Sequence, residues 1–182
     1  MKKYSSYCEY VKTLENENPH KIYHDTQYGY TISNDDELFG QLILEINQAG
    51  LSWTTVLKKK ENIKKAFSNF NIEKIANYSN KDILRLLNDK GIIRNNLKIN
   101  AIIHNAKRIV AIQKEYGSFL KWTSNFSAYE LSEWIILFKA NFKFTGGEIT
   151  KEFLLSSGII KGAHIPSCTL YNKLKNLNKK TL

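Results

Sequence analysis

The chain has 182 residues, enough for one domain or two small ones that fold without disulfides, and its 27 Lys and Arg against 17 Asp and Glu give a formal net charge of +10. The 42% hydrophobic content argues against a disordered chain. The sequence has no apolar run of roughly 20 residues, and Met1–Tyr7 lacks the apolar stretch of a secretory signal. We therefore expect a cytoplasmic protein without a membrane partner. The basic surplus favours DNA or RNA as partner, although nearly all the basic residues are Lys, which an AT-rich genome also encodes frequently.

Start and stop signals for helices recur along the chain, and strand-like alternation is nearly absent. The clearest helix begins after Ser33–Asn34, carries acids in its first turn and ends at Gly50. A long amphipathic helix follows the turn at Gly91. The pattern predicts one all-α unit over residues 1–182, with helices at about 35–49, 52–67, 71 onward, 79–88, 95–116, 127–142 and 148–157.

Glu45 lies on the apolar face of the first clear helix. It follows Leu38 by seven residues and Leu42 by three, so it shares the face that should point to the core. A buried carboxylate needs hydrogen-bond donors, which come either from a structural ion pair or from a ligand in a pocket. Trp53 opens the next helix and is either a core residue or the wall of a pocket for a flat ligand.

Residues 86–98 are typical of a helix, a tight turn at Gly91 and a second helix. Such a turn directs backbone N–H groups outward where the second helix begins, which makes a seat for an anion. Arg94 and Lys98 would strengthen the binding of a phosphate there. Gly91, Arg94 and Lys98 are therefore a candidate contact to the DNA backbone, and an ordinary helical hairpin is the alternative.

The two Cys residues stand near opposite ends of the chain, each with a His within reach. Cys8 can pair with His24, and Cys168 follows His164 by four residues. Two Cys and two His make a complete tetrahedral set for zinc, which would tie the two ends of the chain together. A disulfide is not expected in the cytoplasm, and two unrelated buried thiols are the alternative.

These features occur together, and in this order, in one known family. The sequence resembles the 3-methyladenine DNA glycosylase I family over nearly its whole length. The most specific match is the segment Gln48–Trp53. The matching stretches are Tyr23–Asp25, Leu44–Lys59, Gly91–Arg94, Lys98–Ala106, Phe142–Phe144, Gly158–Ile160 and His164–Cys168.

The resemblance implies a helix-hairpin-helix DNA glycosylase fold, with the hairpin at about 81–116. It also implies one structural Zn²⁺ per chain, which joins the terminal segments at about 1–30 and 158–182. By position, Glu45 matches the catalytic pocket carboxylate, Trp53 the stacking aromatic residue and Tyr23 a pocket tyrosine. The zinc ligands implied by position are Cys8, His24, His164 and Cys168.

The implied activity is hydrolysis of the N-glycosidic bond of 3-methyladenine in alkylated double-stranded DNA. The resemblance implies a monomer that performs no lyase step. Unlike most relatives with this hairpin, the family lacks a catalytic Asp after it.

Two segments depart from the family pattern. His20 stands where the family usually has another aromatic residue, and Thr145–Thr150 replaces a segment that normally has Gly followed by small or hydroxylic residues. Glu148 adds a negative charge in this second segment. The change motivates an alternative function, a catalytically weak or inactive homologue that binds the DNA backbone or damaged DNA. A basic RNA-associated protein is a third hypothesis, based on charge alone.

Overall fold

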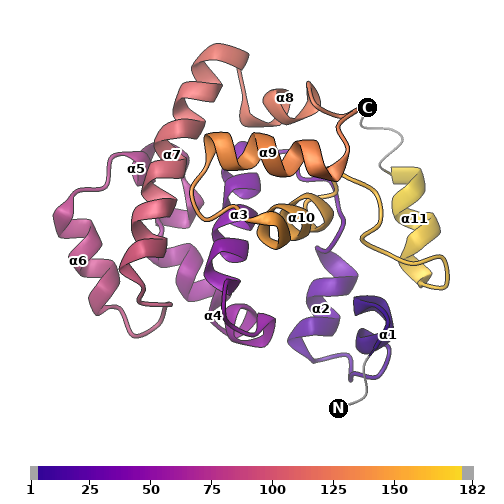
Figure 1. The fold of residues 1–182 in the computed structure, drawn as a ribbon. Coiled ribbons are helices and arrows are strands. Elements are labelled where there is room, and N and C mark those ends of the chain that lie inside the picture. The colour runs from indigo at the N-terminus through magenta and orange to yellow at the C-terminus, as the bar shows by residue number, and fades with distance from the viewer. Residues whose placement is uncertain (1–3, 178–182) are drawn as a thin grey trace. The chain divides into compact units, whose positions relative to one another are not determined.

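The computed structural model describes residues 4–177, and side chains through residue 174, as a succession of helices (Figure 1). No strand occurs among these residues, and none of their helices is long and apolar enough to cross a membrane. The all-α prediction is confirmed. The helices are α1 (Tyr7–Val11), α2 (Pro19–Thr26), α3 (Asp35–Gln48), α4 (Trp53–Ala66), η1 (Ser68–Phe70), α5 (Ile72–Ala76), α6 (Asn80–Asn88), α7 (Asn96–Tyr116), α8 (Phe119–Ser124), α9 (Leu131–Asn141), α10 (Gly147–Ser156) and α11 (Thr169–Leu177).

The chain separates into two compact units. The terminal unit contains residues 1–32 and 154–182, and the central unit contains residues 33–153. Within the terminal unit, the two ends of the chain are in contact, since Lys12 Nζ donates a hydrogen bond to the Ser167 carbonyl at 3.0 Å. The predicted single unit is thus refined, because the two ends form a compact unit of their own. Residues 178–182 of the predicted zinc-tied segment lie outside the described residues.

The observed bounds of α3 to α7 and α10 agree with the predicted helices, whereas α9 begins later than predicted. It starts at Leu131 and not at residue 127. The backbone N–H of Glu130 donates to the Glu133 carboxylate at 2.8 Å, which closes a capping box at this point. The capping pair, and not the upstream Ser127, therefore begins the helix.

Four short helices, α1, α2, α8 and α11, were not predicted. A signal for α2 was present, since Asn18 caps it and Pro19 is its first residue. Helix α8 has a local N-cap, since the Ser118 hydroxyl accepts a hydrogen bond from the Lys121 N–H at 2.9 Å. The Asp35 carboxylate adds hydrogen bonds from the backbone N–H groups of Phe119 and Leu120 at 2.7 and 3.0 Å. This second contact, which comes from another helix, leaves no local pattern in the sequence.

Helix α3 forms the centre of the central unit, in contact with α4, α5, α7 and α8. Every residue from Leu38 to Asn47 is buried. Gly40 makes room for a ring, because a Cβ atom at this position would lie 2.2 Å from Cδ2 of Phe70. Phe70 has a φ of 66°, so its backbone is already in the left-handed region.

The Gly40→Ala variant is expected to lose about 1–3 kcal/mol of unfolding free energy, because the added methyl group overlaps the Phe70 ring in a packed core. Denaturant unfolding measures this loss. Gly146→Ala is the matched control, since a Cβ atom there meets nothing within 4 Å. Equal stability of the two variants would contradict the packing described for α3 and η1.

Candidate functional site

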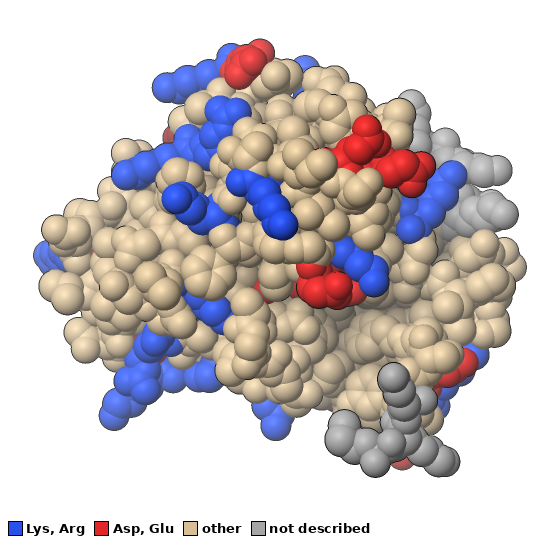
Figure 2. Space-filling view, in the orientation of Figure 1, with Lys and Arg blue, Asp and Glu red and all other residues tan. Residues whose placement is uncertain are grey.

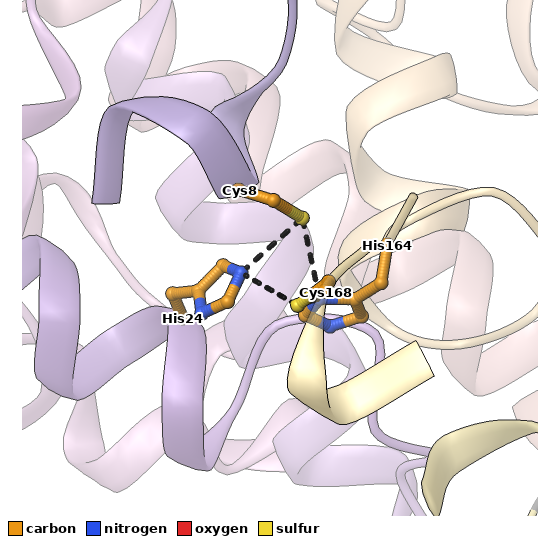
Figure 3. A group of neighbouring side chains, drawn as sticks. All are labelled: Cys8, His24, His164 and Cys168. Carbon is orange, nitrogen blue, oxygen red and sulfur yellow. Dashed lines mark hydrogen bonds between the residues drawn. The ribbon is translucent and has the colours of Figure 1, made fainter. Parts of the chain in front are cut away.

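The structure brings the four predicted metal ligands together in the terminal unit (Figure 3). All four side chains are buried, and their ligand atoms lie within 4.8 Å of one another. Cys8 comes from α1 and His24 from α2, whereas His164 and Cys168 belong to the segment before α11. Four sulfur-to-nitrogen distances describe the cluster: 3.4 Å for Cys8–His24, 3.6 Å for Cys8–His164, 3.8 Å for Cys168–His24 and 3.4 Å for Cys168–His164.

These distances fit a tetrahedral metal site. In a tetrahedral site, an ion with sulfur ligands at about 2.3 Å and nitrogen ligands at about 2.0–2.1 Å separates a sulfur atom from a nitrogen atom by about 3.5–3.6 Å. The observed sulfur-to-nitrogen distances, from 3.4 to 3.8 Å, lie on both sides of this value. The buried Cys₂His₂ cluster could therefore hold a metal ion.

The second ring nitrogen of each histidine has its own acceptor. Nδ1 of His24 lies 2.7 Å from the Asp25 carboxylate, and Nε2 of His164 lies 2.8 Å from the Tyr28 carbonyl oxygen. A proton on each of these nitrogens leaves the other nitrogen as a lone-pair donor toward the cluster. Asp25 and Tyr28 therefore orient the two histidines of the cluster, a role that was not predicted for them. A His followed by Asp was the only local signal.

Protonation within the cluster favours neutral groups when no cation is present. Burial raises the pKa of the Cys8 thiol, and the nearby Cys168 raises it further. Burial also lowers the pKa of His164, which keeps its imidazole neutral. A bound cation would reverse the thiol preference, because it stabilises the thiolate form that coordinates metal.

In the central unit, the predicted carboxylate lies near the end of α3. Glu45 is 2% exposed, and its Oε1 atom accepts a hydrogen bond from Gln41 Nε2 at 2.7 Å. Gln41 stands one turn earlier on the same helix, so α3 itself supplies a donor to the buried charge. The sequence analysis did not single out Gln41, although its spacing of four residues from Glu45 was readable.

We call residues 49–52, which connect α3 to α4, the junction. Gly50 has a φ of 75°, a conformation that favours glycine, and Leu51 is exposed. Ser52 caps α4, and the half-buried Trp53 is its first residue. The junction therefore sets the position of Trp53 relative to the helix that carries Glu45.

Tyr23 belongs to the terminal unit, where it is buried in α2 next to the cluster residue His24. Its predicted role beside Glu45 and Trp53 stays a prediction. The neighbouring departure, His20, is also buried, and its Nδ1 atom lies 3.1 Å from the Tyr7 hydroxyl. Burial lowers the pKa of His20, so that the ring packs as a neutral group.

The divergent segment Thr145–Thr150 has a structural explanation. The Thr145 hydroxyl donates to the carbonyl oxygens of Phe138 and Phe142, both at 3.1 Å, and the Thr150 hydroxyl donates to the Thr145 carbonyl. Glu148 is exposed in the first turn of α10, where a carboxylate interacts favourably with the helix dipole. The segment thus begins a helix, and Glu148 stabilises that beginning.

Helices α6 and α7 form the predicted hairpin. In the described part of the chain, the backbone N–H groups of Ile93, Arg94, Asn96 and Leu97 have no hydrogen-bond acceptor. The side chain of Arg94 is exposed beside them. Backbone donors of this kind at the start of a helix can bind an anion, and the anion seat at the start of the second helix stays a prediction. Figure 2 shows that basic side chains are spread over the face of the molecule drawn there.

Two of the three predicted DNA contacts are placed differently from the prediction. The Gly91 N–H donates to the Asp89 carboxylate at 2.7 Å, so it does not face an external phosphate. Lys98 is only 4% exposed, and its Nζ atom donates to the carbonyl oxygens of Asn47 and Ala49. The structure therefore corrects the expectation that these two residues contact phosphate directly, because their donors already have internal acceptors.

A second lysine supports the hairpin from α4. Nζ of Lys59 donates to the carbonyl oxygens of Lys90 and Gly91 at 3.0 and 3.1 Å. Lys59 is one of five lysines in α4, together with Lys58, Lys60, Lys64 and Lys65. Its role in holding the turn needed the tertiary structure, since 31 residues separate it from Lys90.

The sequence matches the methyladenine glycosylase family over residues 13–134. The DNA-3-methyladenine glycosylase 1 of Escherichia coli (strain K12) is 34% identical over 168 residues, which cover 82% of this chain and 89% of that protein. The DNA-3-methyladenine glycosylase of Haemophilus influenzae is 42% identical over 92 residues, half of each chain.

Solved structures agree with these sequence relatives. A crystal structure of a 3-methyladenine DNA glycosylase I superposes with a TM-score of 0.78 and 31% identity, and it covers 86% of this chain and 96% of that one. The 3-methyladenine DNA glycosylase I of Staphylococcus aureus, solved to explain 3-methyladenine recognition, gives a TM-score of 0.76 with 31% identity over 85% of this chain and 92% of that one.

Proposed function

The chain belongs to the 3-methyladenine DNA glycosylase I family of DNA repair hydrolases, and on that premise we propose that it hydrolyses the N-glycosidic bond of 3-methyladenine in alkylated double-stranded DNA. The observation that carries the proposal is the buried Glu45 carboxylate near the end of α3, just before the junction that leads to Trp53. Glu45 and Trp53 receive their roles because they stand at the matching positions of the family's sequence. The role of Tyr23, which the family resemblance matches to a pocket tyrosine, stays a prediction.

The chemistry of the damaged base suits these side chains. Methylation at N3 leaves the adenine ring cationic, so its bond to the sugar is already weak. The base must leave the helix stack to reach a pocket. Trp53 then offers an aromatic face to the cationic ring, an interaction worth about 1–2 kcal/mol when desolvated. The Glu45 carboxylate accepts hydrogen bonds from the edge of the adenine ring and balances its positive charge.

In the proposed reaction, the bond between C1′ and N9 breaks and its electron pair neutralises the cationic purine. The oxygen of a water molecule forms the new bond to C1′, and the proton that it loses passes to solvent. Positive charge develops on the sugar as the bond breaks. Glu45 stabilises that charge electrostatically, and this is the catalytic role proposed for it.

The hairpin supplies the proposed contact to the DNA backbone. The unpaired N–H groups of residues 93, 94, 96 and 97 and the exposed Arg94 side chain can bind a phosphate whatever the base sequence. The net charge of +10 adds a long-range attraction to the duplex. A monomer in the cytoplasm remains the expected form.

Absence of a lyase step is also part of the proposal. A lyase needs an amine that attacks C1′ as a neutral nucleophile. Lys98 lies on the hairpin helix, and burial lowers the pKa of its ammonium group. However, the carbonyl oxygens of Asn47 and Ala49 accept hydrogen bonds from Nζ at 2.8 and 2.6 Å, which favours the protonated form. This engagement supports a monofunctional enzyme.

For the terminal unit we propose one structural Zn²⁺ per chain, held by Cys8, His24, His164 and Cys168. The support is the mixed sulfur and nitrogen ligand set with four protein ligands, which is typical of closed structural zinc sites. When bound, the ion would link segments from the two ends of the chain.

Incubation with methylated duplex DNA tests the proposed activity. We expect release of free 3-methyladenine, identified by chromatography, together with abasic strands that break only after heat or alkali. Strand cleavage without that treatment would contradict the monofunctional assignment. Salt-sensitive binding of the duplex without base release, by folded and metal-loaded protein, would instead identify the inactive DNA-binding homologue.

A further inference from the structure

Lys98 joins the hairpin to the end of α3. The residue stands in the first turn of α7, and its backbone N–H donates to the side chain of Asn95, which caps that helix. Its side chain runs inward, where Nζ lies 2.8 Å from the Asn47 carbonyl oxygen and 2.6 Å from that of Ala49. A single buried side chain thus connects the element proposed to hold DNA with the helix that carries Glu45.

The two acceptors lie where α3 ends. Asn47 is the second-to-last residue of α3, and Ala49 is its C-cap. The last carbonyl groups of a helix lack partners within the helix and carry the negative end of its dipole. An ammonium group placed between them satisfies both needs. This explains why the lysine is buried although none of the described residues pairs a carboxylate with its charge.

The Ala49 carbonyl is also part of the peptide group that begins the turn at Gly50. The junction has few internal restraints, namely the hydrogen bonds from the Ala49 N–H to Ile46 at 3.3 Å and from the Leu51 N–H to Gln48 at 2.7 Å. The bond from Lys98 fixes the orientation of the peptide group between these two contacts. The direction in which the chain leaves α3 for Trp53 therefore depends on Lys98.

We propose that Lys98 is a positioning residue, which holds the junction so that Trp53 and Glu45 meet the base in the geometry required for bond cleavage. The inference rests on the proposed function and adds to it a residue that acts through the junction and not on the base or the phosphate. Lys59 is its counterpart, because it holds the hairpin turn from α4 at the Lys90 and Gly91 carbonyl oxygens. The two lysines link the hairpin to the α3–α4 pair at two points.

Positioning of this kind is reflected in the rate of the chemical step more than in DNA affinity. A displacement of about 1 Å between catalytic groups and substrate can lower a rate by about 100-fold. The anion seat would keep its N–H groups and Arg94 when the Lys98 side chain is shortened or neutralised, so the dissociation constant for DNA should change little.

The test compares three variants in single-turnover release of 3-methyladenine from methylated duplex DNA, with the DNA dissociation constant and the unfolding midpoint measured in parallel. Lys98→Met removes the ammonium group and keeps the side-chain length. Gly50→Ala disturbs the junction from its exposed side, because its φ of 75° strains an alanine although the added Cβ meets nothing within 4 Å. Lys107→Met is the matched control, since Lys107 is an exposed lysine on the same helix.

We expect Lys98→Met and Gly50→Ala each to lower the single-turnover rate by about 10- to 100-fold, with less than about a threefold change in the DNA dissociation constant. Lys107→Met should match the wild type. Because both changes act through the junction, the double variant should be only slightly slower than the slower single variant, whereas independent effects would multiply.

Several results would overturn the inference. A folded Lys98→Met variant with the wild-type rate would do so, as would rate losses that multiply in the double variant. Loss of DNA affinity at an unchanged rate would make Lys98 a contributor to DNA binding. If Lys98→Met does not fold, Gly50→Ala decides. A wild-type rate in that variant would show that the junction does not affect the rate of bond cleavage, and it would refute the proposal. Failure of the wild type and of Lys107→Met to release base is a different outcome, which refutes the proposed function itself.

Discussion

The His24→Gln variant is expected not to hold the proposed Zn²⁺ and to unfold at a temperature about 10 °C or more below that of the wild type. His24 contributes one of the four ligand atoms, and its Nε2 atom lies 3.4 Å from the Cys8 sulfur and 3.8 Å from the Cys168 sulfur. Without the ion, two buried thiols and the His164 imidazole face one another with no cation between them. Elemental analysis of the purified protein and thermal unfolding measure the two effects.

The exposed His104 on α7 provides the matched control, because His104→Gln makes the same chemical change outside the cluster. This variant should retain one zinc per chain and the wild-type midpoint. Added zinc should raise the midpoint of the wild type after chelation, and it should not do so for His24→Gln. A metal-free wild type with unchanged stability would refute the structural zinc site.

The Glu45→Gln variant is expected to release 3-methyladenine at least about 100-fold more slowly than the wild type. The amide keeps the volume of the carboxylate but removes the negative charge that balances the cationic base and sugar. Gln41 Nε2 can still donate to the amide oxygen at position 45, so the fold of α3 should survive. Single-turnover base release is the measurement, and zinc content and unfolding midpoint show that the protein is intact.

Glu37→Gln is the control for this variant, since Glu37 is exposed in the first turn of the same helix. Its rate should equal that of the wild type. A Glu45→Gln variant with wild-type activity would show that the carboxylate is a structural group and that another residue carries the chemistry. The same result would favour the alternative from the sequence, in which a structural ion pair satisfies the buried Glu45.

Local signals explain which parts of the fold were predictable. Helix α3 has an N-cap at Asn34 that accepts from the Glu37 N–H at 3.1 Å, acids in its first turn and a glycine after its end. Each of these signals lies within four residues of the helix end that it determines. Helix α8 has a local cap at Ser118, but it also receives a contact from Asp35, 84 residues before Phe119, and no short window along the sequence contains both of these residues.

The same distinction applies to the candidate sites. Cys8 and Cys168 were identified as a pair by the type of their side chains and by the family resemblance, and the structure adds that both face His24. For Lys98 the residue type was misleading. A lysine beside an anion seat predicts a phosphate contact, whereas the carbonyl groups that actually bind it lie 49 and 51 residues earlier in the chain.

The sequence by itself determined the all-helical class, most helix bounds in the central unit, the candidate residues and the family. It could do so because capping, helical spacing and motif identity act over a few residues or depend on residue type alone. The tertiary structure decided which hairpin groups are available to a ligand. It gave the donors of Gly91 and Lys98 internal acceptors and left the N–H groups of residues 93, 94, 96 and 97 without acceptors among the described residues. Hydrogen-bond donors are satisfied by whichever acceptors the fold brings near, and those acceptors come from distant parts of the chain.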